Sequence, residues 1–274
     1  MIVTHNLRRA VFLDRDGTLN VEVNYLHRVT DFALIPGAAE AVQALNAAGY
    51  LTLLVTNQAG IARGYYDEAA LHALAPACRA REAGAARVLG VHLEGPYISP
   101  DKLGAQPAFA APPSAPEILT LHAIAPIRVV TLAPELPGAL EATAALVAAG
   151  IRVQIGHSAA SYDEACAALR AGAGGFTHLF NAMSALHQRA PGAVGAALAH
   201  ATHAELIPDL LHVHPGAIRA ALRAIPGLYC VTDATAAAAM PDGDYRLGRQ
   251  LVHKCAGGVR LADGTLAGST LTMD

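Results

Sequence analysis

Short apolar runs that end in a polar or ionisable residue recur six times between residues 88 and 233, and helix-like sequence follows most of them. Strands separated by helices predict βαβ units and a parallel sheet. In a barrel of parallel strands, the side chains at the carboxyl ends of the strands converge on one rim, which is where such barrels place their active sites. The six runs end at Glu94, Glu135, His157, His178 and Asp233 or surround His212.

Two further strand-like runs, at residues 10–13 and 50–56, precede this series. Two strands before residue 60 and six after residue 87 make eight, the number that closes a (β/α)8 barrel, so we predict an α/β, TIM-barrel-like fold. The sequence near residues 245–268 differs, because it contains short strand-like runs with a turn at residues 263–264, and it predicts a small β tail. Helix-like stretches lie at residues 36–49, 67–84, 115–125, 138–150, 161–173 and 215–225.

The composition is that of a folded protein. Hydrophobic residues make up 53% of the 274 residues and charged residues 15%, so the chain can bury a large core. The net charge of −3 comes with no basic stripe, which argues against a nucleic-acid partner. No apolar run reaches the roughly 18 residues of a membrane span, and the N-terminus lacks the apolar core of a signal peptide. We therefore expect a cytoplasmic protein without a membrane partner, whose four scattered cysteines are free thiols.

Three of the strand-end residues form a ligand set for a catalytic metal ion. Glu94, His157 and His178 offer one carboxylate and two imidazoles, and catalytic zinc takes three such ligands while keeping a fourth position for water. The set predicts one divalent metal ion, with Zn²⁺ as the best match and Fe²⁺ or Mn²⁺ as alternatives. Asp233 is then placed to take a proton from the water and return it to the leaving group, and His212 to orient or polarise a substrate carbonyl.

A plainer interpretation stands beside this one for each residue. A single histidine or glutamate near a strand end is more often a hydrogen-bonded structural residue than a catalytic one. His92 and His214 lie beside the candidates in the sequence and are alternatives as hydrogen-bonding neighbours of the ligands. Because the candidate ligands lie far apart in the sequence, their spacing alone supports metal binding only weakly.

Six longer motifs extend the pattern through the second part of the chain. They are HLEGPYISP (92–100), IGHSAA (155–160), FTHLFNAM (176–183), HVHP (212–215), VTDATA (231–236) and GSTLTM (268–273). In these motifs and in their order, the chain from about residue 85 to residue 274 resembles the N-acetylglucosamine-6-phosphate deacetylase family of the amidohydrolase superfamily. The resemblance implies a metal-dependent hydrolase built on a TIM barrel.

The resemblance also implies a reaction and a set of roles. The expected reaction is the deacetylation of N-acetylglucosamine 6-phosphate to glucosamine 6-phosphate and acetate, a step of amino sugar catabolism. Members of the family are oligomers, so a homo-oligomer is possible. The implied roles are metal ligand for Glu94, His157 and His178, general base for Asp233, acetamide contact for His212, and sugar phosphate contacts for Asn181, the backbone of Ala182 and Arg189.

The front of the chain carries the motifs of a different family. AVFLDRDGTLN (10–20) followed by VTNQAGIARGYY (55–66) resembles the haloacid dehalogenase superfamily, most nearly its heptose-bisphosphate and histidinol-phosphate phosphatases. The resemblance implies that Asp14 is a nucleophile, Asp16 the acid/base and Thr56 a phosphate-binding residue, with Mg²⁺ as cofactor. A calcium loop or an ordinary turn is the alternative for DRDG. The later motifs of such a phosphatase would fall where the deacetylase-like sequence stands.

These observations predict two segments and leave three functions open. Residues 1–84 would be a phosphatase-like Rossmannoid fragment of two βα units, and residues 85–274 a partial deacetylase-like TIM barrel of six. Our hypothesis is that the two N-terminal units fill the first two barrel positions; two loosely packed half-domains are the alternative. The functions are a metal-dependent deacetylase, a sugar-phosphate phosphatase acting through Asp14 and Asp16, and an inactive fusion that only binds sugar phosphate.

Overall fold

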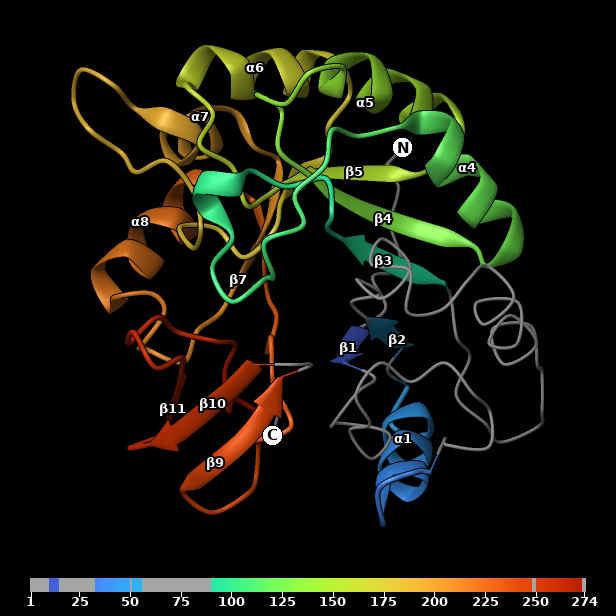
Figure 1. Ribbon diagram of the computed structural model, residues 1–274, viewed down its shortest axis with the longest axis vertical. Helices are drawn as coiled ribbons and strands as arrows, with labels where there is room; N and C mark the ends of the chain where they lie inside the picture. The colour runs from blue at the N-terminus through green and yellow to red at the C-terminus, as the bar shows by residue number, and fades with distance from the viewer. Residues whose placement is uncertain (1–9, 15–32, 50, 56–89, 248–249, 273–274) are drawn as a thin grey trace, which may run out of the picture.

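The computed structural model describes residues 10–14, 33–49, 51–55, 90–247 and 250–272, and they form an α/β protein with a separate small sheet. In the main body, strands and helices alternate, and helices α4 to α8 form an arc outside strands β3 to β8 (Figure 1). The strands are β1 (Ala10–Asp14), β2 (Leu51–Val55), β3 (Val91–Glu94), β4 (Ile127–Leu132), β5 (Arg152–Ile155), β6 (Gly175–Phe176), β7 (His203–Leu206) and β8 (Gly227–Cys230). The helices are α1 (Ala38–Ala47), α4 (Ala115–Ile124), α5 (Ala139–Ala148), α6 (Tyr162–Arg170), α7 (Gly192–His200) and α8 (Pro215–Ala224), with a 3-10 turn η2 (Pro100–Lys102).

The strand pairing is parallel throughout the main body. Strands β3, β4, β5 and β6 form one sheet in that order, while β1 pairs with β2 and β7 pairs with β8. Strand β2 lies against β3 and β6 against β7, but no hydrogen-bonded ladder joins these neighbours within the described residues. The parallel α/β prediction is therefore confirmed, whereas the closed eight-stranded ring, the segment boundary near residue 84 and the phosphatase-like origin of the first two units stay predictions.

Within the described residues, α-helices form where the sequence predicts them, with one addition. Helix α6 has a full capping box, in which the Ser161 side chain accepts the Glu164 N–H and the Glu164 side chain accepts the Ser161 N–H. Helix α7 was not predicted, because its sequence GAVGAALAH is rich in glycine and has no polar face; its first six residues are buried. The predicted helix at residues 67–84 lies outside the described residues. No helix in the described part of the chain is long and apolar enough to cross a membrane.

The core lies between the sheet and the helices that cover it. Strand residues such as Val130, Val153 and Phe176 are fully buried and pack with Ile118 of α4 and Leu146 of α5 in one continuous cluster. This burial holds the carboxyl ends of β3 to β8 in fixed relative positions, which is what the rim residues need in order to converge.

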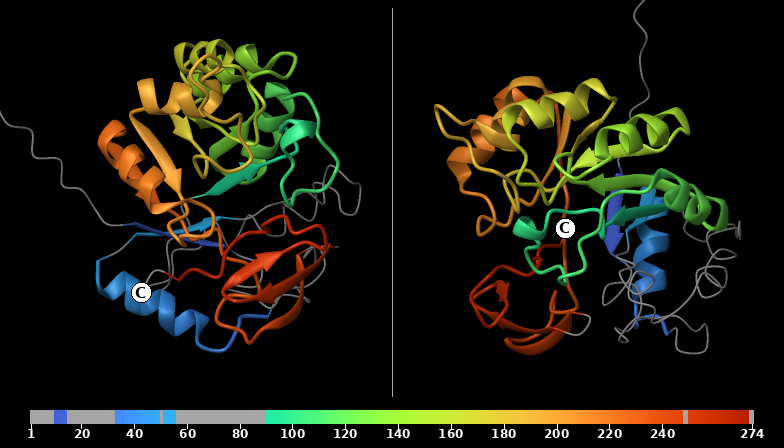
Figure 2. Two further views of the ribbon diagram at one scale, coloured as in Figure 1. Left: turned by 90° about the vertical axis from the view of Figure 1, so that its left-hand side faces the viewer. Right: turned by 45° about the horizontal axis from the view of Figure 1, so that its top comes forward.

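The small sheet confirms the predicted β tail. Strands β9 (Gly243–Leu247), β10 (Gln250–Cys255) and β11 (Gly258–Arg260) pair antiparallel in the order β11–β10–β9. The predicted turn follows them, where the Thr265 N–H donates to Asp263 Oδ1 at 2.9 Å. The sheet has its own apolar cluster around Val252 and Val259 and lies away from helices α5 and α6 in both views of Figure 2.

Candidate metal centre

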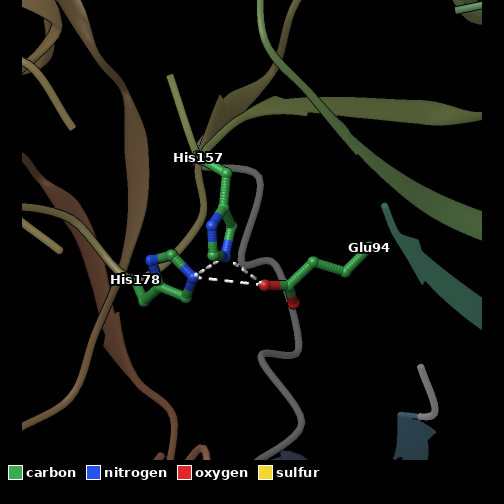
Figure 3. A group of neighbouring side chains, drawn as sticks. All are labelled: Glu94, His157 and His178. Atoms are coloured by element: carbon green, nitrogen blue, oxygen red, sulfur yellow. Dashed lines mark hydrogen bonds and ion pairs between the residues drawn. The ribbon is translucent and has the colours of Figure 1, made fainter. Parts of the chain in front are cut away.

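Three strand ends bring Glu94, His157 and His178 together. Glu94 is the last residue of β3, and each histidine follows the end of its strand by two residues. Both histidines have a left-handed backbone, with φ of 47° and 31°, a conformation that is uncommon for residues other than glycine and that clusters at functional sites. One ligand atom from each of the three side chains lies within 4.8 Å of the others, and Figure 3 shows them pointing at one another.

The distances describe a compact triangle. His157 Nε2 lies 2.9 Å from Glu94 Oε1, His178 Nε2 lies 3.2 Å from the same oxygen, and the two Nε2 atoms are 3.0 Å apart. Ligand atoms held about 2.1 Å from a tetrahedral ion would be about 3.4 Å apart, so a small expansion of the triangle suffices to admit one. Both histidines are 6% exposed, which places the triangle largely out of bulk water.

Hydrogen bonding shows that the triangle suits a cation. His157 Nδ1 lies 2.8 Å from the carbonyl oxygen of Lys102, and because a carbonyl only accepts, Nδ1 carries the proton. The Nε2 atom of a neutral His157 then presents a lone pair to the Glu94 carboxylate and to His178 Nε2. Electron pairs that converge in this way are stabilised by an added proton or by a metal ion. The described residues therefore contain a possible metal site with a fitting donor set.

The charges of the triangle shift the pKa values in opposite directions. Burial raises the pKa of Glu94, but hydrogen bonds with His157 and His178 outweigh it and hold that pKa well below its usual value. Burial lowers the pKa of His178, but the hydrogen bond and charge of Glu94 raise it to about 9. Both shifts have one physical cause, which is that the ionised carboxylate attracts positive charge into the triangle.

Asp233 lies at the same rim, three residues beyond β8, with φ of 48°. Desolvation raises the pKa of its carboxyl, Glu94 adds to the rise, and the charges of His178 and His212 oppose it. Because the residue Asp233 as a whole is exposed to solvent, water that reaches it moderates the desolvation. These interactions place its carboxyl near the triangle.

A segment near the end of the described chain holds the Asp233 loop. The Ser269 N–H donates to the Asp233 carbonyl at 2.6 Å, the Ser269 hydroxyl donates to the Thr232 carbonyl at 2.5 Å, and the Thr235 N–H donates to the Ser269 carbonyl at 3.0 Å. Ser269 is 1% exposed. The sequence showed GSTLTM as a motif, but only the structure shows that Ser269 of this motif is hydrogen-bonded to the loop that carries Asp233.

His212 lies in the loop after β7 and contacts a carboxylate that the sequence analysis did not select. Its Nδ1 is 2.6 Å from Asp209 Oδ2. The signal that could have identified Asp209 is the Asp-x-x-His spacing in IPDLLHV. Glu205 was also missed; it is a buried carboxylate in β7 that accepts hydrogen bonds from Gln154 Nε2 at 2.8 Å and Tyr229 OH at 3.0 Å. A glutamate inside an otherwise apolar run was its only signal.

Other residues of the strand-end series have structural roles. Glu135 is not part of the triangle, because its carboxylate accepts the Ser158 hydroxyl at 2.7 Å and the Ala159 N–H at 2.6 Å and so holds the loop after His157. His92 Nε2 contacts Thr131 Oγ1 at 2.7 Å within the sheet interior. His214 caps helix α8 by accepting the Gly216 N–H. For His92 and His214 these contacts support the structural interpretation.

The remaining predicted residues are only partly placed. Asn181 Nδ2 donates to the carbonyls of His178 at 3.1 Å and Leu179 at 3.3 Å, so its amide nitrogen holds the loop that carries a ligand. The Ala182 carbonyl accepts the Ser158 N–H at 2.9 Å, and Arg189 is exposed on the loop before α7. Their phosphate contacts stay predictions. Asp14 ends β1, and its side chain, like Asp16 and Thr56, lies outside the described residues.

Parallel βα units with a carboxylate and two imidazoles at the strand ends define an α/β protein of the amidohydrolase class. No family model matches the chain. It is 44% identical over 195 residues to an N-acetylglucosamine-6-phosphate deacetylase from Lysinibacillus sphaericus, covering 69% of this chain and 50% of that protein. It is 44% identical over 211 residues to an N-acetylgalactosamine-6-phosphate deacetylase from Escherichia coli O157:H7, covering 75% of this chain and 56% of that protein.

A solved structure extends the comparison. The crystal structure of N-acetylglucosamine-6-phosphate deacetylase from Pasteurella multocida is similar with a TM-score of 0.77 and 32% identity, covering 97% of this chain and 68% of that one. The chain therefore belongs to the N-acetylglucosamine-6-phosphate deacetylase family. It spans about half the length of the curated relatives it matches.

Proposed function

We propose that the chain is a metal-dependent hydrolase that converts N-acetylglucosamine 6-phosphate and water to glucosamine 6-phosphate and acetate. The observation that carries the proposal is the triangle of Glu94, His157 and His178 beside Asp233 at one rim. Family membership supports the substrate class, because the relatives are named as deacetylases of 6-phosphorylated N-acetyl amino sugars.

In this proposal Glu94, His157 and His178 hold one divalent metal ion. Zinc is our choice, because two imidazoles and one carboxylate form a frequent catalytic zinc set, with Fe²⁺ or Mn²⁺ as alternatives. The ion would supply Lewis-acid polarisation of the amide and would make water a better nucleophile at neutral pH. The hydrogen bond from His157 Nδ1 to the Lys102 carbonyl keeps the ligating Nε2 of His157 free of a proton.

Asp233 is proposed to move the protons of the reaction. Its carboxylate accepts a proton from the attacking water and passes it to the nitrogen of the leaving amine, so that the C–N bond breaks as the amine becomes neutral. His212 would contact the acetamide, and the left-handed loop with Asn181 and Ala182, together with Arg189, would bind the 6-phosphate. An arginine suits this role because its planar donors match a dianion.

The proposal leaves the configuration of the substrate sugar at C4 open. One relative at 44% identity is named for the glucosamine substrate and another at 44% for the galactosamine substrate, which differ in configuration at C4. Both epimers therefore belong in the assay. A cytoplasmic location and a homo-oligomer are further proposals, which cell fractionation and light scattering of the purified chain test.

The main experiment measures bound metal, acetate release from both N-acetyl amino sugar 6-phosphates, and phosphate release from a generic ester. We expect acetate release that Asp233→Asn abolishes and that Asp14→Asn leaves unchanged, with one metal ion per chain in both variants. Phosphate release that is lost only in Asp14→Asn would favour the phosphatase instead. Bound metal without turnover of any substrate would favour an inactive fusion that binds sugar phosphate.

A further inference from the structure

The contact between His212 and Asp209 determines which ring nitrogen of His212 is available to a bound substrate. His212 Nδ1 lies 2.6 Å from Asp209 Oδ2, and the side chains are 6% and 9% exposed. A carboxylate can only accept a hydrogen bond, so the proton of this contact is on Nδ1. The other ring nitrogen, Nε2, is therefore the atom that His212 can offer to a bound molecule.

We infer that Asp209 is a positioning residue that fixes the tautomer and orientation of His212, so that His212 presents Nε2 to the substrate. The inference rests on the proposed function for the identity of that substrate. The His212 ring lies close enough to Asp233 for their charges to interact, so it lies near the proposed base.

Asp209 is itself held in place. Its second oxygen, Oδ1, accepts the N–H of Leu211 at 3.0 Å and the N–H of His212 at 2.8 Å. Leu210, between Asp209 and Leu211, has a left-handed backbone with φ of 64°. Side-chain to backbone bonds of this kind close a tight turn, so the carboxylate and the imidazole that it holds form one rigid unit.

The charge of Asp209 has a chemical consequence beyond orientation. When Nε2 donates a hydrogen bond to an acetamide oxygen that gains negative charge, the ring carries positive charge, and the adjacent carboxylate stabilises it. An aspartate that orients a histidine through its Nδ1 proton has the same effect in hydrolases with a catalytic triad. A neutral amide at this position would still accept the backbone N–H groups of the turn, but it would not stabilise a positive charge on the His212 ring.

Two variants separate positioning from turn formation. Asp209→Asn keeps an oxygen that accepts the backbone N–H groups but removes the charge, whereas His212→Gln removes the ring. We expect Asp209→Asn to lower kcat about 10–100-fold with little change in KM, the range that is found when a residue that orients a metal-ligating histidine is replaced. In a His212→Gln background the same change should cost less than about twofold. An equal loss in both backgrounds would overturn the inference.

A matched control and a spectroscopic readout complete the test. Asp263 also closes a turn by accepting a backbone N–H, from Thr265, but it is exposed and holds no histidine, so Asp263→Asn should leave kcat unchanged. Nitrogen-15 spectra of labelled histidines, assigned with His212→Gln, should show the His212 proton on Nδ1 in the unmodified protein and its loss from Nδ1 in Asp209→Ala. A neutral His212 protonated on Nε2 would refute the inference, whether or not the protein releases acetate.

Discussion

The turn at Gly268 offers a sharp test of how the Asp233 loop is held. Gly268 has φ of +69°, and a Cβ added there would lie 2.5 Å from Thr235 Cγ2 and 2.8 Å from the Asp233 carbonyl oxygen. The carbonyl is backbone that the Ser269 N–H already holds at 2.6 Å, so it has little freedom to move. Gly268→Ala should therefore strain the backbone and displace the loop of the proposed base.

The magnitude follows from two contributions. A residue other than glycine in the left-handed region costs about 1–2 kcal/mol, and overpacking a filled site costs about 1–3 kcal/mol. Gly268→Ala should thus lower the free energy of unfolding by about 2–5 kcal/mol. Gly264→Ala is the matched control, because Gly264 has φ of +89° and nothing within 4 Å of an added Cβ. The control should cost only the backbone contribution of about 1–2 kcal/mol.

Urea unfolding followed by circular dichroism measures both variants, and the difference between them isolates the steric contribution. We also expect Gly268→Ala to lose acetate release beyond its loss of stability, since the carbonyl that it pushes belongs to Asp233. Equal unfolding free energies for the two variants, within about 0.5 kcal/mol, would show that the Asp233 loop can move without cost and that Ser269 does not hold it in place.

Three further predictions concern the helix cap, the buried carboxylate and the triangle. Ser161→Ala removes the capping box of α6 and should lower the unfolding free energy by about 1 kcal/mol in urea titration, whereas an unchanged midpoint would mean that the cap does not matter. Glu205→Ala leaves the donors of Gln154 and Tyr229 without their acceptor and should cost about 3 kcal/mol or more, which a loss below about 1 kcal/mol would contradict. Zn²⁺ at about 100 times its Kd should add about 3 kcal/mol to the unfolding free energy, and the gain should vanish in Glu94→Gln; a gain of the same size in both proteins would place the ion elsewhere.

Local patterns predicted the elements because each depends on residues close in the sequence. Alternation of apolar runs and helix-like stretches indicated the strands β1 to β8, and the spacing of Ser161 and Glu164 indicated the start of α6. Helix α7 was missed because its Gly192–His200 sequence has neither a polar face nor a local cap, and its stability comes from packing against α6 and α8. The same limit applies to every element whose stability comes from its neighbours.

The sequence by itself determined which side chains stand at the strand ends, and the tertiary structure decided which of them meet. Glu94 contacts His157 and His178 across separations of 63 and 84 residues, which no local spacing can specify. Glu135 ends a similar run but is turned to the Ser158 loop. Hydrogen-bond partners depend on distances in the folded chain. For that reason the contacts of Glu205 and Ser269 became visible only once the strands were packed, whereas the contact of Asp209 with His212 spans three residues and had a local signal.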